Sequence, residues 1–393
     1  MRSLKWRSCL ILITELNWGE LSPEIFLRDY WQKKPLLIRN AFPGFQPAID
    51  ADELAGLACE DDIESRLIIN DPASGHWALE HGPFAPERFA ELGDAPWTLL
   101  VQAVDHWVPD VAPLLEAFNF IPQWRRDDLM ISYASDGGGV GPHYDNYDVF
   151  LLQAEGVRRW EVGGLFGEDS PRREDTPVMI LPEWHAEQSW ELNPGDMLYL
   201  PPRVGHNGVG VGDGCMTWSI GFRAPSHAEI LRGLTNTLCD SLSTDLRYTD
   251  ADLALTAKPG EIDAAAIARL SSILQQYLGD PDRLAHWFGT FMTEPKYPEL
   301  TGSDETLTAA ELAEALEEGA ELVRAEGARL AWHQNSDSSL TLFADGQPFP
   351  VFAVAAKNLA QQLCLHHRFR PLFDDETAPL LLALLNQGSL YLE

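Results

Sequence analysis

The sequence is poor in basic residues. It has 28 Lys and Arg against 60 Asp and Glu among 393 residues, so its formal net charge at pH 7 is −32. Such a chain repels a phosphate backbone, and no local basic cluster offsets the repulsion, so we do not expect stable binding of DNA or RNA. An acidic surface attracts basic partners instead. The composition therefore favours a protein that meets something positively charged.

Cysteine is also scarce, and long apolar runs are missing. The five cysteines are scattered and form no CxxC pair, which argues against a disulfide framework and a Cys-rich zinc site. No stretch approaches the roughly 18 apolar residues of a transmembrane helix. Residues 1–14 place basic residues before an apolar run, but the run is too short for a signal peptide and no small-residue cleavage site follows. We therefore expect a cytoplasmic protein without membrane association.

The length exceeds that of a single hydrophobic core, so we expect two or three domains. Residues 16–125 combine helical patterns at 22–34 and 52–59 with candidate strands at 35–39 and 66–70. This part of the chain has mixed structure.

From residue 128 to 224 the pattern changes to short apolar or alternating runs broken by Gly, Pro and Asp. The expected strands are 129–135, 149–154, 159–162, 188–192, 197–200 and 216–222. Several short strands at close spacing, with a turn signal at 193–196, indicate an antiparallel barrel or sandwich.

After Pro225 the apolar residues recur with a helical period. Helices are expected at 230–242, 267–278 and 284–292, and residues 295–304 have the composition of a linker. A small α+β module should follow, with a helix at 307–326, two strands around the turn at 344–347, and helices near 353–364 and 378–387.

The most informative segment is the glycine run 137–139, which His143 and Asp145 follow. On an extended chain residues i and i+2 face the same side, so both side chains can point into a barrel. A third ligand should come from a strand that returns beside the first, and the turn, strand and stop at 194–202 lead to His206. Two histidines and one carboxylate form the facial triad of non-haem Fe(II) oxygenases, which leaves coordination positions open for a cosubstrate and O2.

A 2-oxoglutarate enzyme also needs a cation for the distal carboxylate of this cosubstrate. Because neighbouring strand residues face opposite sides, Arg158 shares a face with Trp160 and Val162, and Arg159 lies on the other face. We predict that Arg158 binds the carboxylate, unless it pairs with a carboxylate of the protein itself. Ser132 is a candidate hydroxyl near the same carboxylate, or an ordinary strand serine. The most conspicuous remaining histidine, His185, is expected in a loop.

Longer segments around these residues carry a family resemblance. The strongest are 129–133, 139–150, 158–160, 198–206 and 219–225, and similar segments occur at 31–35, 81–84 and 100–107. Together they resemble the bacterial ribosomal oxygenases of the JmjC family, the ribosomal-protein arginine 3-hydroxylases. The resemblance starts at about residue 16, is strong to residue 225 and is looser in the C-terminal third. Residues 1–15 lie upstream of where the family usually begins, and we assign them no function.

The resemblance implies a mixed α+β chain with a double-stranded β-helix (JmjC/cupin) barrel. The catalytic domain would span 16–225, with its core at about 110–225, followed by a helical dimerisation region at 226–294 and a winged-helix-like module at 295–393. It also implies Fe(II) at His143, Asp145 and His206, and 2-oxoglutarate at Arg158 and Ser132. The apolar stripes of 226–294 independently favour a homodimer, because one small module could not bury them.

We therefore expect an Fe(II)- and 2-oxoglutarate-dependent oxygenase that uses O2 to hydroxylate the β-carbon of an arginine in a basic large-subunit ribosomal protein. Asp136 and Asp148 are candidates to meet the substrate guanidinium, or ordinary turn aspartates. Other functions stay open. They are a JmjC hydroxylase of a histidine in another ribosomal protein, a non-oxidative cupin metalloenzyme, which would not need Arg158, and a non-catalytic binding protein.

Overall fold

The computed structural model describes residues 15–71, 74–300, 302 and 306–393. The apolar segment 1–14, for which we excluded a signal peptide, lies outside the described residues, and so does part of the expected linker. The chain forms two compact units, unit 1 (Met1–Ala224) and unit 2 (Pro225–Glu393). Within the described ranges no helix has the length and apolar character needed to cross a membrane.

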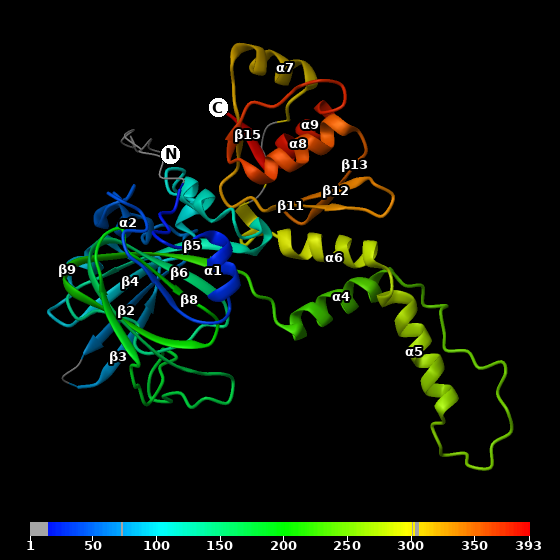
Figure 1. Ribbon diagram of the computed structural model, residues 1–393, viewed down its shortest axis with the longest axis horizontal. Helices are drawn as coiled ribbons and strands as arrows, with labels where there is room; N and C mark the ends of the chain where they lie inside the picture. Colours follow the sequence, from blue (N-terminus) through cyan, green and yellow to red (C-terminus); the bar gives the residue numbers. More distant parts are fainter. Residues whose placement is uncertain (1–14, 72–73, 301, 303–305) are drawn as a thin grey trace. The chain divides into compact units, whose positions relative to one another are not determined.

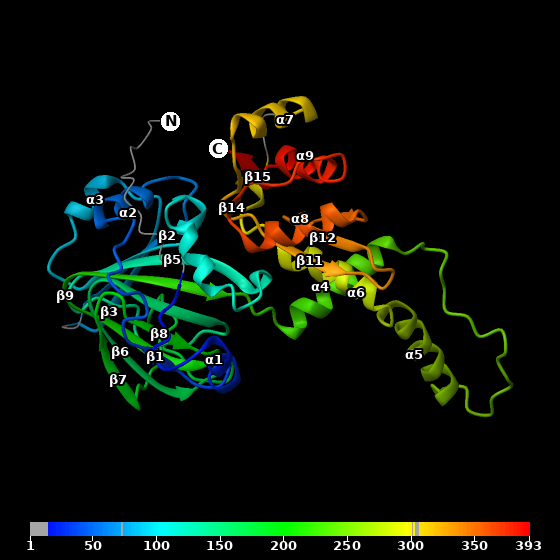
Figure 2. The same cartoon turned by 45° about the horizontal axis from the view of Figure 1, so that its top comes forward.

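Unit 1 is built on a nine-stranded antiparallel sheet (Figures 1 and 2). Its strands are β1 Leu36–Ile38, β2 Ser65–Asp71, β3 His76–His81, β4 Trp97–Val101, β5 Arg126–Ala134, β6 Asp148–Leu165, β7 Gln188–Leu192, β8 Met197–Leu200 and β9 Val204–Phe222. They run in the order β1-β8-β6-β9-β5-β4-β2-β3, and β7 pairs with β6. The strands expected at 188–192 and 197–200 coincide with β7 and β8.

The two longest strands curve the sheet into a barrel. Strands β6 and β9 are 18 and 19 residues long and pair along most of their length. Their register shifts on both sides of Glu155, next to Gly156, whose φ is 63° and whose Cβ, if present, would lie 2.5 Å from the carbonyl oxygen of Gly214. Such bulges bend a strand and increase its twist, and Figure 1 shows the curvature. The sequence predicted two strands, 149–154 and 159–162, because this glycine interrupts the pattern, whereas the structure joins them in β6.

The barrel wall has two apolar faces. Val149 and Leu151 of β6 belong to the same buried cluster as Trp160 and Val162 farther along the strand. Phe150, between the first two, belongs to a larger cluster with the helices that cover the other side of the sheet. Alternate residues of β6 therefore face the barrel interior, as expected for a strand that is buried on both faces.

Short helices cover the outer face of unit 1. They are α1 Pro23–Asp29, α2 Ala51–Leu57 and α3 Pro86–Ala90, with the 3₁₀ turns η1 Val104–His106, η2 Ala112–Phe118 and η3 Gln123–Arg125. The Ser22 side chain caps α1, and Asp50 and Glu53 form a capping box on α2. Phe26 of α1 is fully buried in the large cluster, so these helices close the outer core.

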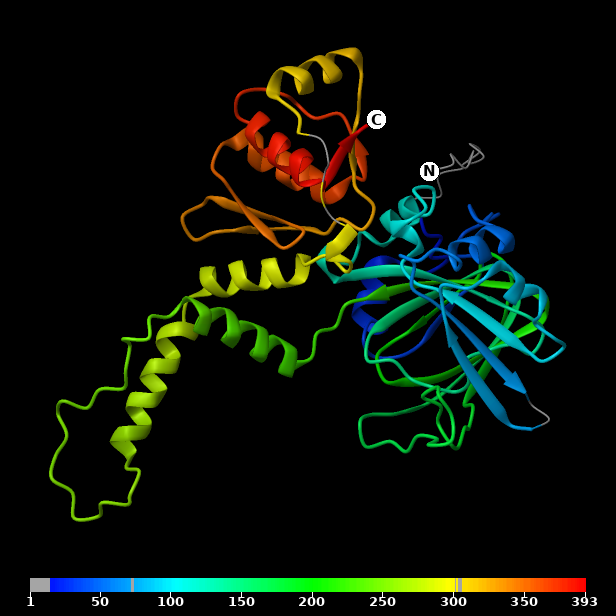
Figure 3. The ribbon, with the colours of Figure 1, turned by 180° about the vertical axis from the view of Figure 1, so that it is seen from behind.

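Unit 2 begins with three helices, α4 His227–Ser241, α5 Ala264–Leu278 and α6 Pro281–Thr293. They lie where the helical period predicted them. Each begins at a capping side chain, namely Ser226, Asp263 and Asp280. Helix α6 packs against α4 and against the strands that follow, but α5 has no buried residue and extends away from those strands (Figure 3).

The rest of unit 2 is a small α+β module with two three-stranded sheets. Its elements are the turn η4 Pro298–Leu300, helices α7 Ala309–Glu318, α8 Val354–Leu365 and α9 Ala378–Gln387, and strands β10 Leu322–Arg324, β11 Leu330–Gln334, β12 Leu340–Ala344, β13 Gln347–Val351, β14 Arg368–Phe369 and β15 Leu390–Leu392. The rings of His286 on α6 and Phe343 on β12 lie 5.9 Å apart. Helix α6, which ends at Thr293, thus packs on the strands of the module that follows it. The expected boundary at 294/295 lies directly after this helix.

One helix differs from its prediction. The pattern predicted a helix over 307–326, but α7 ends at Glu318 because Gly319 adopts φ 107°, a left-handed conformation that ends helices. The chain then enters β10, which pairs with β15 at the other end of the module. The apolar residues after Gly319 form a strand and not a further helical turn.

Candidate metal centre and cosubstrate pocket

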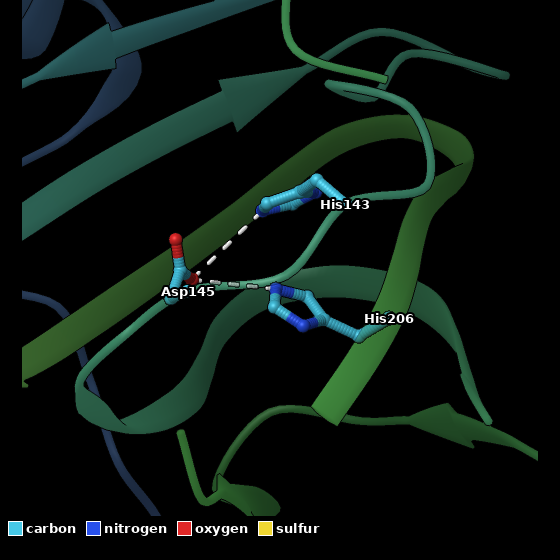
Figure 4. Close-up of side chains that lie close together, drawn as sticks. All are labelled: His143, Asp145 and His206. Carbon is cyan, nitrogen blue, oxygen red and sulfur yellow. Dashed lines mark ion pairs between the residues drawn. The ribbon is translucent and has the colours of Figure 1, made fainter. Parts of the chain in front are cut away.

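His143, Asp145 and His206 converge in the barrel of unit 1 (Figure 4). His143 and Asp145 lie in the loop between β5 and β6, and His206 lies on β9. The Oδ2 atom of Asp145 is 4.0 Å from Nε2 of His143 and 3.6 Å from Nε2 of His206. Among the described residues, this is the one group of three or more His, Cys, Asp or Glu side chains whose ligand atoms lie within 4.8 Å of one another.

The backbone fixes the two histidines relative to each other. The N–H of His143 donates to the carbonyl oxygen of His206 at 2.9 Å, and the reverse bond measures 2.8 Å. The N–H of Arg203 donates to the carbonyl oxygen of Asp145. The loop that follows the glycine run is thus held against β9, and all three side chains are brought to one point.

Hydrogen bonds also set the imidazole tautomers. Nδ1 of His143 lies 2.8 Å from the carbonyl oxygen of Gly141, and Nδ1 of His206 lies 3.0 Å from that of Val204. Because a carbonyl oxygen only accepts, each Nδ1 carries the hydrogen, and each Nε2 offers its lone pair toward Asp145. Burial and the neighbouring His143 lower the pKa of His206 to about 4, which keeps its imidazole neutral. Neutral imidazoles and one carboxylate are a fitting donor set for Fe(II).

Arg158 is buried on the same face of β6 as Trp160 and Val162, and Arg159 is exposed. Its Nη2 donates to the carbonyl oxygen of Gly208 at 3.2 Å, and its Nε and Nη1 are buried without a hydrogen-bond partner in the described structure. No protein carboxylate therefore neutralises it in the described part of the chain. Burial lowers the pKa of Arg158 from its ordinary value. A Cβ on Gly208 would lie 2.6 Å from Nε, so only glycine leaves room for the guanidinium here.

The inner face near Arg158 carries further polar side chains. Ser132 is buried on β5 and lies opposite Thr217 of β9 and Leu100 of β4. Gln153 of β6 also lies opposite Thr217, whose hydroxyl donates to it at 3.1 Å. Residues that face each other on antiparallel strands share a face of the sheet, so Ser132 lines the interior.

Thr98 is a member of this set that the sequence analysis missed. It lies two residues before Leu100 on β4, hence on the same face, and its hydroxyl is fully buried without a described partner. Thr98, Gln153 and Thr217 are each polar residues between two apolar neighbours on a strand, and this pattern could have identified them.

Asp148 does not have the surroundings we expected. Its side chain is fully buried at the start of β6. It accepts hydrogen bonds from Gln32 Nε2 at 2.9 Å, from Arg125 Nη2 at 3.2 Å and from the Tyr199 hydroxyl at 2.7 Å. Burial raises the pKa of Asp148, and these bonds oppose the shift. The carboxylate binds a guanidinium of its own chain, so it is not accessible to a substrate, contrary to the prediction.

Asp136 has a different environment. It is exposed, and its Oδ1 accepts the N–H of Gly212 on β9 at 2.8 Å. This bond holds the carboxylate at the surface beside the glycine run. Its role toward a substrate stays a prediction. His185 is exposed in the loop before β7 and is not part of the cluster.

Comparisons with known proteins agree with this architecture. Residues 113–230 match the JmjC domain family, and residues 272–391 match the ROXA-like winged helix. The ribosomal protein uL16 3-hydroxylase of Escherichia coli is 34% identical over 387 residues, which cover 96% of this chain and 98% of that protein. A probable ribosomal oxygenase of Haemophilus influenzae is 35% identical over 340 residues, which cover 83% of this chain and 82% of that protein.

Solved structures show the same similarity. The X-ray structure of Escherichia coli YcfD superimposes on this chain with a TM-score of 0.86 at 32% sequence identity. The match covers 96% of this chain and 100% of the YcfD chain. A YcfD structure in complex with cobalt and 2-oxoglutarate has a TM-score of 0.84 at 32% identity, over 96% of this chain and 99% of that one. The expected fold class and family are thereby confirmed. This chain belongs to the ribosomal oxygenases of the JmjC family.

Proposed function

We propose that this protein is an Fe(II)- and 2-oxoglutarate-dependent oxygenase that hydroxylates the β-carbon of an arginine in a large-subunit ribosomal protein. The observation that carries the proposal is the buried Arg158, whose Nε and Nη1 have no described partner, in the same barrel as the His143, Asp145 and His206 cluster. A non-oxidative cupin enzyme would need the metal ligands alone. An unpaired buried guanidinium is costly unless an anion binds there.

The three clustered side chains would hold the metal through Nε2 of each histidine and one oxygen of Asp145. The Nδ1 hydrogen bonds to backbone carbonyls keep both imidazoles oriented, with each Nε2 toward Asp145. When bound, iron and 2-oxoglutarate supply the oxidising chemistry that inserts one oxygen atom of O2 into a C–H bond. The protein contributes the geometry of the ligands, and Trp160 and Val162 make the surrounding barrel interior apolar.

Arg158 and Ser132 would bind the distal carboxylate of 2-oxoglutarate. The guanidinium has unpaired donors on Nε and Nη1, and a carboxylate accepts charge-assisted hydrogen bonds from such donors. The Ser132 hydroxyl lines the same interior face. Together these groups would orient the cosubstrate along the barrel, with its other end toward the metal ligands.

The substrate proposal rests on charge and on similarity. The Escherichia coli relative is named a ribosomal protein uL16 3-hydroxylase, and position 3 of an amino acid is its β-carbon. The net charge of −32 favours encounter with a basic protein by long-range attraction that weakens with salt. Asp136, exposed beside the glycine run, is the carboxylate we propose for the substrate guanidinium.

We also propose that the protein is a cytoplasmic homodimer. Helix α5 has no buried residue, and Ile267, Leu270, Ile273 and Leu274 are exposed along it. One face of a helix that is apolar and uncovered indicates a partner surface. A second copy would bury this face symmetrically.

The test offers purified protein Fe(II), 2-oxoglutarate and three substrates. These are the isolated ribosomal protein, its loop peptide, and the same peptide with arginine replaced by lysine or histidine. We expect succinate release that is coupled to hydroxylation of the protein and the arginine peptide. Equal hydroxylation of the lysine peptide would contradict the arginine assignment, and hydroxylation of the histidine peptide alone would favour the histidyl alternative. Absence of succinate release with every substrate would contradict the oxygenase assignment itself.

A further inference from the structure

The C-terminal module carries an apolar surface at the start of α8. Phe352, Val354 and Leu372 are 70%, 71% and 68% exposed, and we call these three side chains the α8 shelf. Two hollows of about 470 and 460 Å³ adjoin it, the first beside Val354 and Leu372 and the second beside Phe352. Glu376 lines both hollows, so they form one continuous surface.

The α8 shelf is not a loosely packed part of the core. The helix is also well buried, because Ala360 and Leu363 belong to the core cluster of the module, as does Leu359, which lines the first hollow. Thus the helix already has its packing partner, and the shelf residues lie outside that core. Single exposed apolar residues are ordinary, but several large ones beside a hollow indicate an interaction site.

The charges around the shelf indicate the kind of partner. Asp375 and Glu376 lie at the edge of the hollows, and both are exposed. Arg370 also lines the first hollow, but its guanidinium donates to the carbonyl oxygen of Gly319 and lies 3.5 Å from the Glu321 carboxylate. Lys357 donates to the carbonyl oxygen of Ser338. Residues 306–393 contain 12 Asp and Glu against 5 Lys and Arg. An apolar shelf with acidic edges is complementary to a segment that combines basic and apolar side chains, and it repels nucleic acid.

We propose that the α8 shelf docks a basic segment of the ribosomal protein substrate, at a site separate from the metal centre. This inference rests on the proposed function for the identity of the partner. One apolar side chain of the segment would enter each hollow, and Asp375 and Glu376 would pair with its Lys or Arg residues. Docking there raises the effective concentration of the target loop at the barrel, because the second contact becomes intramolecular.

The experiment compares two substrates in each variant, the whole ribosomal protein and the short loop peptide that contains the target arginine. The apolar variants are Phe352→Ser and Val354→Ser, and the charge variant is Asp375→Lys. Their matched controls on the same module are Trp332→Ser, which removes an exposed apolar side chain outside both hollows, and Glu317→Lys, which makes the same charge change on α7. All shelf variants change exposed side chains, and thermal melts verify that they fold.

We expect the shelf variants to raise KM for the whole protein about five- to thirty-fold, as the loss of one contact of about 1–2 kcal/mol implies. KM for the loop peptide should not change, and both controls should behave as wild type. An unchanged KM for the whole protein would overturn the docking proposal and leave the proposed function intact. A shelf variant that changes the oligomeric mass and not KM would also overturn it, since the shelf would then contact a second copy. Inactivity of the wild type toward both substrates would instead contradict the proposed function.

Discussion

Arg158 donates a single hydrogen bond, from its Nη2 to the carbonyl oxygen of Gly208, and its other two guanidinium nitrogens are buried without a described partner. A buried cation with unmet donors destabilises a fold by several kcal/mol in principle. We propose that an anion binds to Arg158, which lies on the inner face of β6 in the barrel that also holds His206.

The first prediction separates the two adjacent arginines. Arg158→Ala should weaken binding of 2-oxoglutarate about ten- to a hundred-fold, because a charged hydrogen bond contributes roughly 1.5 to 3 kcal/mol. Arg159→Ala should have little effect, since Arg159 is exposed and lies near Glu161. The measurement is the KM for 2-oxoglutarate in a succinate-release assay. Equal effects of the two substitutions would mean that the inner face of β6 does not bind the cosubstrate.

The second prediction concerns the metal. His143→Ala and Asp145→Ala should each abolish binding of Co(II), followed by calorimetry, because each removes one of three clustered ligand atoms. Both side chains are partly exposed, so the melting temperature should change little. His185→Ala is the control, since this histidine lies in an exposed loop. Retained Co(II) affinity in both ligand variants would refute the metal site.

The third prediction concerns Asp148. Asp148→Ala should destabilise the protein by about 3 kcal/mol or more, because it leaves Gln32, Arg125 and Tyr199 without their shared acceptor. Denaturant unfolding measures the change. A substrate-binding role would give the opposite pattern, with unchanged stability and a raised KM for the ribosomal protein.

The fourth prediction concerns Thr98. Thr98→Val keeps the volume and removes a buried hydroxyl that has no described partner in the chain. The folded state should not be destabilised, whereas KM for 2-oxoglutarate should rise about five-fold, the effect of one neutral hydrogen bond of about 1 kcal/mol. Thr217→Val serves as the comparison, because its hydroxyl already bonds Gln153. If Thr98→Val lowered stability and left KM unchanged, the hydroxyl would have a structural partner.

The fifth prediction concerns assembly. Leu270 on α5 is 49% exposed, and Leu270→Glu would place a charge in the proposed interface. Light scattering should give about twice the chain mass of 43.8 kDa for the wild type and the single-chain mass for the variant. A wild type that is monomeric at micromolar concentration would contradict the homodimer.

The clustering of His143, Asp145 and His206 could be predicted from the sequence because local geometry determines their relation. His143 and Asp145 are two residues apart on an extended segment, and a turn and strand lead directly to His206. The alternation of β6 likewise separated buried Arg158 from exposed Arg159, since strand periodicity alone decides the face.

Other features depend on contacts that periodicity does not contain. The burial of Asp148 arises from Gln32, far earlier in the chain, and from Tyr199 on β8, so its hydrogen-bond partners become visible only when the strands are assembled. Thr98 faces the barrel because β4 pairs with β5 in a particular register. The end of α7 was missed because the left-handed conformation of Gly319 outweighs the apolar residues that follow it.

The most direct test of the central claim is the fate of oxygen in the substrate. Purified protein with Fe(II) and 2-oxoglutarate is incubated with the isolated basic ribosomal protein under isotopically heavy O2, and the product is sequenced by tandem mass spectrometry. We predict one heavy oxygen atom on the β-carbon of a single arginine, together with succinate, and neither product in the Asp145→Ala variant. Oxygen derived from water, or succinate formation without any modified arginine, would contradict the account.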